Sequence, residues 1–228
     1  MDERFSRSAR ILGEEKMEKL NKSSVIVFGI GGVGGAAFEA LVRGGVGTVA
    51  VVDKDIVDIT NINRQIIATN DNVGEKKVDV AEARALSINP DIILKKYDLF
   101  YLPETADEID LTEYDFIIDA IDNVTAKLEL IERANKLGVP IIASMGTGNK
   151  LHPELFEIAD INKTSVCPLA RVMRRELKNR GVKKLTVVYS KEEPIKNEGS
   201  VPGSVSFTPP VAGYLMASYV IQKLIEEV

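Results

Sequence analysis

The stretch SVIVFGIGGVG, residues 24–34, joins a run of β-branched and aromatic side chains to a glycine-rich turn. A second apolar run, Thr48–Val52, follows it and ends on Asp53. The glycines complete the pattern G-x-G-x-x-G, and an acidic residue about twenty positions further on is typical of a nucleotide-binding βαβ unit. The spacing therefore predicts a strand, a helix and a second strand that together hold a nucleotide.

Each residue of this unit has an expected physical role. Gly29 allows the tight turn, Gly31 lets a phosphate approach the backbone, and Gly34 lets the helix pack closely on the strand. The helix N-terminus adds free N–H groups and a positive dipole end, which attract an anion. Asp53 can accept hydrogen bonds from ribose hydroxyls. A glycine-rich turn with a purely structural role is the alternative.

The bulk composition bounds the class of protein. The 228 residues are 45% hydrophobic and 28% charged, which is ordinary for a globular chain with a sizeable core. The net charge of −5 argues against a generally basic protein that coats nucleic acid. Cys167 is the single cysteine, so an intramolecular disulfide is excluded and a reducing compartment, the cytoplasm, is favoured. With His152 as the single histidine, a closed zinc site of Cys and His is excluded too.

Strand-like and helix-like segments alternate after the first unit. The expected elements are a loop at 60–71, a helix at 74–86, strands at 92–97 and 116–120, a helix at 124–137 and a strand at 140–144. This alternation predicts an α/β fold with a Rossmann-like, doubly wound, mostly parallel sheet that binds ligands at the carboxyl ends of its strands.

The remainder of the chain differs in character. The expected elements are a sheet extension at 155–161, a loop at 162–168, a basic helix at 169–179, a strand at 185–189 and a long loop at 191–208. We expect one domain over residues 1–228, with a nucleotide-binding core at 1–150 and a C-terminal elaboration at 151–228 for substrate binding and dimerisation.

The most apolar tract lies at the C-terminal end, at residues 211–225. It is shorter than a bilayer span and is interrupted by Ser218, Gln222 and Lys223. The charged N-terminus also lacks the apolar segment of a signal peptide. We expect a buried helix, with a dimer interface as one place for its apolar face, and no membrane partner.

Further polar residues lie where the strand ends should meet. They are Asp53-Lys54-Asp55, residues 61–65, Lys76-Lys77 and Asp122-Asn123. Arginine and lysine can neutralise the β- and γ-phosphates of ATP, and a carboxylate can hold Mg²⁺. A dehydrogenase needs no such mixture, and the chain contains no G-x-x-x-x-G-K-[ST] motif. We therefore expect adenylyl transfer at the α-phosphate, with pyrophosphate as the leaving group; solvated loop charges are the alternative.

In this order and spacing, the motifs resemble the ubiquitin-activating superfamily, in particular its HesA/MoeB/ThiF branch of bacterial adenylyltransferases. The matching stretches are Arg4–Arg7 with Leu12-Gly13, the glycine turn, 53–55, Asn61 with Arg64-Gln65, Val73-Gly74 with Lys77, and 121–123. The resemblance spans about residues 4–150 and implies ATP-dependent adenylation of a carboxylate.

The resemblance also implies individual roles. Asp53 would bind the ribose, and Asn61 would assist at the α-phosphate. Asp122 would hold Mg²⁺, and Arg7 would reach the γ-phosphate bound by the partner in a homodimer. The implied catalytic residues are Arg7, Asn61, Arg64, Lys77 and Asp122. The implied nucleotide contacts are Gly29, Gly31, Gly32, Gly34, Asp53, Asp55, Arg64, Gln65 and Lys77.

The C-terminal third departs from the molybdopterin and thiamine enzymes, which carry Cys-x-x-Cys pairs for zinc. From residues 163–171 through 202–204 it resembles the tRNA threonylcarbamoyladenosine dehydratase group instead. That group uses ATP to activate a threonine carboxylate on a modified adenosine beside the anticodon, and loss of AMP closes a ring. The resemblance therefore implies ATP and Mg²⁺ without zinc, and tRNA as partner. A sulfur-transfer accessory protein is a further partner that it allows.

A basic helix independently favours RNA as a partner. Its basic residues, Arg171, Arg174, Arg175 and Lys178, have the spacing i, i+3, i+4 and i+7. Arg180, Lys183 and Lys184 continue the patch, and Glu176 is the one acidic residue between 171 and 184. Such a stripe can neutralise phosphates. A solvated helix face is the alternative.

Two other functions stay open. An activator of the C-terminal glycine of a ubiquitin-like sulfur carrier would need a protein partner and could use Cys167 covalently. A nucleotide-binding scaffold would retain ATP affinity without turnover. For Cys167 the alternative is a small, partly buried loop residue, and we expect a structural role for His152.

Overall fold

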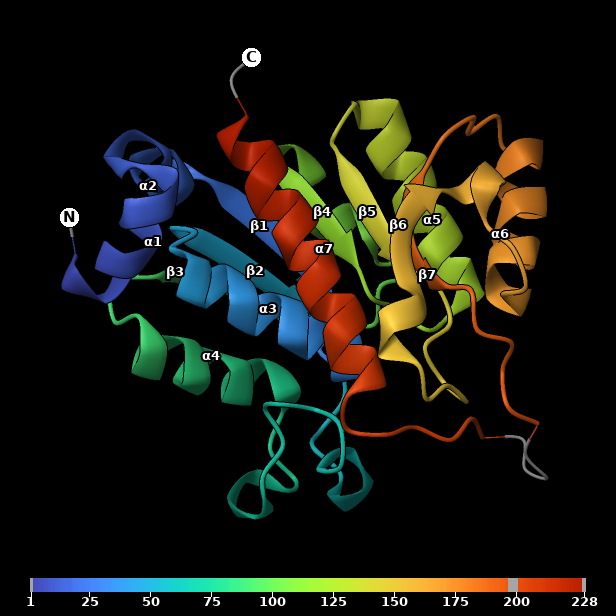
Figure 1. Ribbon diagram of the computed structural model, residues 1–228, viewed down its shortest axis with the longest axis horizontal. Coiled ribbons are helices and arrows are strands. Elements are labelled where there is room, and N and C mark those ends of the chain that lie inside the picture. Colours follow the sequence, from blue (N-terminus) through green and yellow to red (C-terminus); the bar gives the residue numbers. More distant parts are fainter. Residues whose placement is uncertain (1, 197–200, 227–228) are drawn as a thin grey trace.

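The computed structural model describes residues 2–196 and 201–226. Within them, a seven-stranded sheet has the order β3-β2-β1-β4-β5-β7-β6 (Figure 1). The strands are β1 (Ser24–Phe28), β2 (Thr48–Val52), β3 (Ile93–Tyr97), β4 (Phe116–Asp119), β5 (Ile141–Ser144), β6 (Phe156–Asp160) and β7 (Thr186–Ser190). All neighbouring strands are parallel except β6 and β7, which are antiparallel. The predicted mostly parallel, Rossmann-like sheet is confirmed.

Helices cover both faces of the sheet. They are α1 (Ser6–Leu12), α2 (Glu14–Lys22), α3 (Gly32–Gly44), α4 (Lys77–Ile88), α5 (Val124–Leu137), α6 (Pro168–Asn179) and α7 (Thr208–Ile225). Short 3-10 helices are η1 (Glu3–Phe5), η2 (Ile59–Asn61), η3 (Asn70–Asn72), η4 (Ala106–Glu108), η5 (Leu111–Glu113), η6 (Pro153–Leu155) and η7 (Ile161–Lys163). Helices α3, α4 and α7 pack on one face; α5 packs on the other, with α6 against it.

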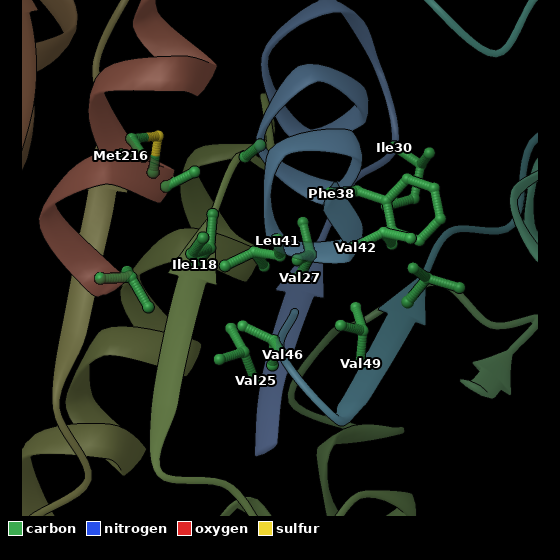
Figure 2. Close-up of a cluster of buried hydrophobic side chains, with 14 of the residues drawn as sticks. Val25, Val27, Ile30, Phe38, Leu41, Val42, Val46, Val49, Ile118 and Met216 are labelled. Carbon is green, nitrogen blue, oxygen red and sulfur yellow. The ribbon is translucent and has the colours of Figure 1, made fainter. Parts of the chain in front are cut away.

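The alternation of side chains along β1 explains the two layers. Val25 and Val27 point into the core beneath α3, where Figure 2 shows them with Leu41. Ile26 and Phe28 point into the opposite core, beneath α5. Side chains of successive strand residues face opposite sides, so a strand covered on both faces is apolar throughout. Burial of each such side chain contributes about 1.5–3 kcal/mol.

Helix α7 is buried against α3 of the same chain. An ideal Cβ at Gly213 would lie 2.1 Å from the Val33 carbonyl oxygen, so the two backbones approach closely here. The predicted buried helix is confirmed, and the dimer interface stays a prediction. Among the described residues, no helix has both the length and the apolar character that a membrane crossing needs.

Some predicted boundaries are wrong, each for a local reason. Helix α4 begins at Lys77 rather than 74, because Gly74 has a φ of +93° and Lys76 bridges to Ile56 in extended conformation. Helices α6 and α7 begin earlier than predicted, since proline is tolerated in a first turn where its missing N–H has no partner to lose.

The C-terminal third completes the core sheet instead of standing apart from it. Strands β6 and β7 extend the sheet beyond β5, and α7 joins the main hydrophobic core. The predicted loop at 191–208 falls partly on residues 197–200, which lie outside the described residues. The division of the chain at residue 150, and the assignment of 151–228 to substrate binding and dimerisation, stay predictions.

Candidate functional site

Strands β1 and β4 are neighbours at the point in the sheet where the strand order reverses. From β1 the chain builds β2 and β3 on one side, and from β4 it builds β5 and β7 on the other. In open α/β sheets, ligands bind in the crevice at the carboxyl ends of such strands. A cavity of about 600 Å³ occupies this position. The predicted site residues that line it are Gly29, Gly31, Gly32, Asp53, Asp55, Asn61, Arg64, Gln65, Lys77 and Asp122.

The geometry of the glycine turn explains three of its glycines. Gly29 has a φ of +83°, and an ideal Cβ on it would lie 2.8 Å from the Ala120 carbonyl oxygen. A Cβ at Gly34 would lie 1.8 Å from the Gly29 carbonyl oxygen, so Gly34 serves close packing behind the cavity rather than its lining. A Cβ at Gly31 would meet only Gln65, at 3.9 Å, which leaves its backbone open to the cavity.

Asp53 braces the turn from the end of β2. Its Oδ2 accepts a hydrogen bond from the Ile30 N–H at 2.7 Å, and its Oδ1 accepts one from the Asp55 N–H at 2.9 Å. Burial raises the pKa of this carboxyl, and the nearby Lys77 ammonium acts in the opposite direction. Each carboxylate oxygen still has a lone pair with which to accept a ribose hydroxyl.

Lys77 places a buried positive charge in the cavity wall. It is the first residue of α4, and its Nζ lies 3.0 Å from Asp55 Oδ2 and 3.9 Å from Asp53 Oδ2. Only 6% of its side chain is exposed, so the two carboxylates fix its position. A lysine beside a helix N-terminus is suited to phosphate.

The loop before α4 presents three predicted residues together. Asn61 is buried, and its Oδ1 accepts from the Asp58 N–H at 3.1 Å in a capping box. Arg64 Nη1 donates to the Thr60 carbonyl at 2.8 Å. Gln65 is 6% exposed, and its Oε1 has no partner among the described residues. A buried acceptor without a partner in a cavity wall suits a donor from a ligand.

Asp122 follows β4 on a loop that a buried ion pair holds. Lys127 Nζ lies 3.0 Å from Asp119 Oδ2, and both side chains are fully buried. The same Nζ donates to the Ile121 carbonyl at 3.0 Å, beside Asp122. Burial raises the pKa of Asp119, and Lys127 opposes that effect. Sequence reasoning missed this pair, because Asp119 and Lys127 lie eight residues apart on different elements.

Asp122 itself is exposed to the cavity and is a suitable ligand for Mg²⁺. This ion binds through one or two carboxylates and completes its shell with water and phosphate oxygens. No group of three His, Cys, Asp or Glu side chains within the described chain is placed to hold a metal ion. A metal at Asp122 would therefore depend on ligand phosphates.

An apolar wall that sequence reasoning also missed faces the glycine turn. It consists of Leu99, Phe100 and Tyr101, which follow β3. The Lys54 ammonium lies 3.9 Å above the Phe100 ring, and the Tyr101 ring contacts Phe28 edge-on at 4.8 Å. Burial raises the pKa of Tyr101 to about 12. Flat apolar surface of this kind suits a nucleobase.

The C-terminal third contributes the opposite wall. Residues 201–204, here called the strap, line the cavity together with Thr147 and Gly148. Gly203 N–H donates to Asn149 Oδ1 at 2.6 Å, and Asn149 N–H donates to the Gly203 carbonyl at 2.8 Å. The strap therefore connects the nucleotide cavity to the part of the chain that sequence reasoning assigned to substrate.

Arg7 does not reach the cavity of its own chain. It is exposed on α1, which follows Phe5. Phe5 packs near Gly45 at the far end of α3, whereas α3 begins at the cavity. At 1.5 Å per residue this helix is about 20 Å long. The predicted role of Arg7 therefore requires a second chain.

The basic residues of α6 differ in their exposure and contacts. Arg171, Arg175 and Lys178 are exposed, as predicted for a solvent-facing stripe. Arg174 departs from that stripe, because its half-buried Nη1 donates to the Thr164 carbonyl at 2.9 Å and contacts the Thr164 hydroxyl. Arg174 therefore also holds the loop before α6, and its contact with RNA stays a prediction.

Cys167 and His152 lie outside the cavity lining. Cys167 is 2% exposed at the start of α6, and its sulfur lies 3.7 Å from where a Cβ on Gly146 would be. The buried Lys150 is its neighbour; burial lowers the pKa of that ammonium, and Cys167 acts in the opposite direction. His152 is exposed and contacts Glu154 at 2.8 Å.

Comparison with known proteins places this geometry in context. The model of the ThiF family matches residues 5–227. The tRNA threonylcarbamoyladenosine dehydratase of Bacillus subtilis is 40% identical over 98% of this chain and 95% of its own length. A sulfur carrier protein adenylyltransferase of Thermus thermophilus is 38% identical over 58% of this chain and 48% of its own length.

Solved structures agree with the sequence relatives. The E. coli tRNA N6-threonylcarbamoyladenosine dehydratase in complex with ATP superimposes with a TM-score of 0.92 and 32% identity, covering 97% of this chain and 93% of that one. Its complex with AMP gives the same TM-score and covers 94% of that chain. On the family match, the full-length likeness and the shared fold, the chain belongs to the ThiF family.

Proposed function

We propose that this protein is an ATP-dependent dehydratase that cyclises threonylcarbamoyladenosine in tRNA next to the anticodon. The observation that carries the proposal is the strap, because it brings the C-terminal third into the wall of the nucleotide cavity. The full-length likeness to the B. subtilis enzyme includes this third, whereas the likeness to the sulfur carrier enzyme covers 58% of the chain.

The proposed nucleotide roles are those that the resemblance implies, and the presence of these residues in the cavity lining supports them. Asp53 binds the ribose beside the turn that it braces. Arg64 and Lys77 neutralise the polyphosphate, and Asn61 assists at the α-phosphate. Asp122 holds Mg²⁺, which supplies further positive charge to the leaving pyrophosphate when it is bound. These residues stabilise charge that develops as the bond to the α-phosphorus breaks.

The reaction then needs two steps. A carboxylate oxygen of the threonyl group attacks the α-phosphorus, and pyrophosphate leaves. A nucleophilic atom of the same side chain next attacks the activated carbonyl carbon, loses its proton and expels AMP. The carboxylate oxygen that made the first attack departs with AMP, so the modified nucleoside loses one water overall.

Two partners follow from the exposed basic residues. Arg171, Arg175 and Lys178 contact tRNA phosphates from α6. As the resemblance implies, Arg7 acts on the γ-phosphate that the other chain of a homodimer binds; its distance from its own cavity is consistent with this role. The single cysteine agrees with a cytoplasmic protein. A sulfur-transfer accessory protein stays a prediction from the resemblance alone.

The function is tested with purified protein, MgATP and tRNA that carries threonylcarbamoyladenosine. We expect AMP release that depends on this tRNA, and a nucleoside mass lower by one water. AMP release that instead requires a protein with a Gly-Gly tail would move the assignment to a sulfur carrier activator. ATP binding without release of AMP, with either the tRNA or the protein, would favour a nucleotide-binding scaffold.

The homodimer has its own test in mixed variants. Chains with Arg7→Ala and chains with Asp122→Ala should each be inactive alone. Mixing them should restore part of the activity, because one cavity of each mixed dimer then has an intact Asp122 and an intact Arg7 from the other chain. No recovery after verified chain exchange would contradict a shared site.

A further inference from the structure

One side chain, Asn63, joins two loops that are far apart in the sequence. Arg64 Nη1 donates to Asn63 Oδ1 at 2.9 Å, and Asn63 Nδ2 donates to the Ser204 carbonyl oxygen of the strap at 3.0 Å. Arginine can only donate and a carbonyl can only accept, so these two contacts fix the orientation of the amide between them. The residue thus bridges the strap and the loop at 61–65, here called the nucleotide loop.

Arg64 can keep this contact while it binds phosphate. Its bonds to Asn63 and to the Thr60 carbonyl both use Nη1. The guanidinium has further N–H donors on Nη2 and Nε, and these have no protein partner in residues 2–196 and 201–226. A phosphate oxygen can therefore occupy one side of the guanidinium while Asn63 orients the other.

The strap has a second anchor that lies away from the nucleotide loop. Asn149 exchanges two hydrogen bonds with Gly203, and its φ of +57° places its side chain and backbone toward the strap together. This anchor fixes the strap to the loop that follows β5. Within the described residues, the strap is therefore connected to Arg64 through its contact with Asn63.

Ser204 presents an unused hydroxyl at the same place. It lines the cavity, and its Oγ is buried without a partner among the described residues. A buried hydroxyl of this kind suits a carboxylate or phosphate oxygen of a ligand. The Asn63 contact to the adjacent carbonyl sets the position of this hydroxyl.

We propose that Asn63 is a positioning residue that couples the two halves of the site. It orients Arg64 toward the polyphosphate and, through the same amide, holds Ser204 of the strap over the carboxylate that is to be activated. Nucleotide binding thereby tightens the strap before the substrate reacts. The identity of that carboxylate rests on the proposed function; the coupling itself needs only ATP.

The coupling is tested with a reporter on the strap. The chain contains no tryptophan, and Phe207 is 46% exposed just beyond the strap and outside the cavity lining. Phe207→Trp therefore supplies a single indole whose quenching by acrylamide reports strap mobility. In this background we expect saturating ATP to reduce the quenching. Asn63→Ala should weaken ATP binding about fivefold, because Arg64 keeps its charge but loses one orienting hydrogen bond, and abolish the protection even at saturating ATP.

Two matched variants separate coupling from anchoring. Asn149→Gly tolerates the positive φ and removes the side-chain hydrogen bond of the second anchor, so quenching should rise with and without ATP while the protection by ATP persists. Asn70→Ala removes an exposed amide from the same loop region and should behave as the parent. Hydrogen exchange of the strap amides in chains that keep Phe207 provides the same readout without the indole.

Turnover gives the second readout. At saturating ATP, Asn63→Ala should lower kcat/KM for the modified tRNA about fivefold more than Asn70→Ala does. Unchanged ATP affinity together with full protection in Asn63→Ala would overturn the coupling, as would a parent chain whose strap does not respond to ATP. A parent that never dehydrates the tRNA would overturn the proposed function instead, and the strap response to ATP would still be measurable.

Discussion

The two walls of the cavity are stabilised by different kinds of contact. The nucleotide wall, formed by the glycine turn and the ends of β2 and β4, is backed by two buried ion pairs, Lys77–Asp53 and Lys127–Asp119. The substrate wall, formed by residues 147–149 and the strap, is held by hydrogen bonds to backbone groups. Breaking a buried ion pair costs far more than exchanging a hydrogen bond with a ligand or with water. We infer that the ATP side is preorganised and that the substrate side adjusts.

The largest expected effect is a loss of stability when an ion pair behind the nucleotide wall is broken. Lys127→Met should lower the free energy of unfolding by about 3–5 kcal/mol, because it leaves Asp119 buried and unpaired. Denaturant unfolding measures the change. Asn149→Gly on the substrate wall should cost only about 1 kcal/mol.

The double variant Lys127→Met with Asp119→Asn provides the control for this comparison. It removes both charges and should recover most of the lost stability. A loss for Lys127→Met no larger than that for Asn149→Gly would remove the distinction between the two walls.

Asp122→Ala should abolish ATP–pyrophosphate exchange, with a loss of about a hundredfold or more, because the variant lacks the carboxylate for Mg²⁺. The side chain is exposed, so thermal unfolding should stay as in the parent. Asp107→Ala, at a carboxylate that is 89% exposed and outside the cavity lining, is the matched control. Full exchange by the Asp122 variant would refute the metal assignment.

Charge reversal on α6 should weaken the binding of tRNA and leave the binding of ATP unchanged. Arg171→Glu with Arg175→Glu should weaken tRNA binding about tenfold and reduce its salt dependence, whereas ATP affinity should not change. Lys16→Glu with Lys22→Glu on α2 makes the same change in net charge on the opposite side of the molecule (Figure 1). Equal weakening by both pairs would indicate a general charge effect rather than an interface on α6.

The smallest effect concerns the apolar wall. The pKa of Tyr101 is raised to about 12, so the unfolded chain, with a tyrosine near pH 10, loses its proton first. Stability should therefore fall between pH 10 and pH 12, since the unfolded state binds fewer protons there. Tyr101→Phe should reduce this fall and change stability at pH 7 by less than about 1 kcal/mol, because the hydroxyl lacks a partner. An identical alkaline fall in the variant would contradict the assignment.

The nucleotide wall could be predicted from the sequence because its residues act where strands end. Gly29 is required by its own positive φ and Gly34 by its close approach to Gly29, both within one βαβ unit. Asp53 follows β2 and braces the turn. Parallel strands end at one edge of a sheet, so residues after different strands, such as Asp122, converge without detailed knowledge of packing.

The substrate wall could not be predicted in the same way. The contact of Asn63 with Ser204 joins residues 141 positions apart, and no local pattern indicates it. Arg174 has the spacing of an exposed stripe, but the loop before α6 supplies carbonyl acceptors that fold over it. Lys127 is buried on α5, but the periodicity of the helix alone does not show whether this position faces the core or the solvent.

The route of the carboxylate oxygen tests the central claim most directly. With heavy oxygen in the threonyl carboxylate of the modified tRNA, adenylation followed by ring closure predicts one labelled oxygen in the AMP that is released, in equal amount to the cyclised nucleoside. Label in inorganic phosphate, with ADP as the other product, would contradict the account, because activation would then occur at the γ-phosphate.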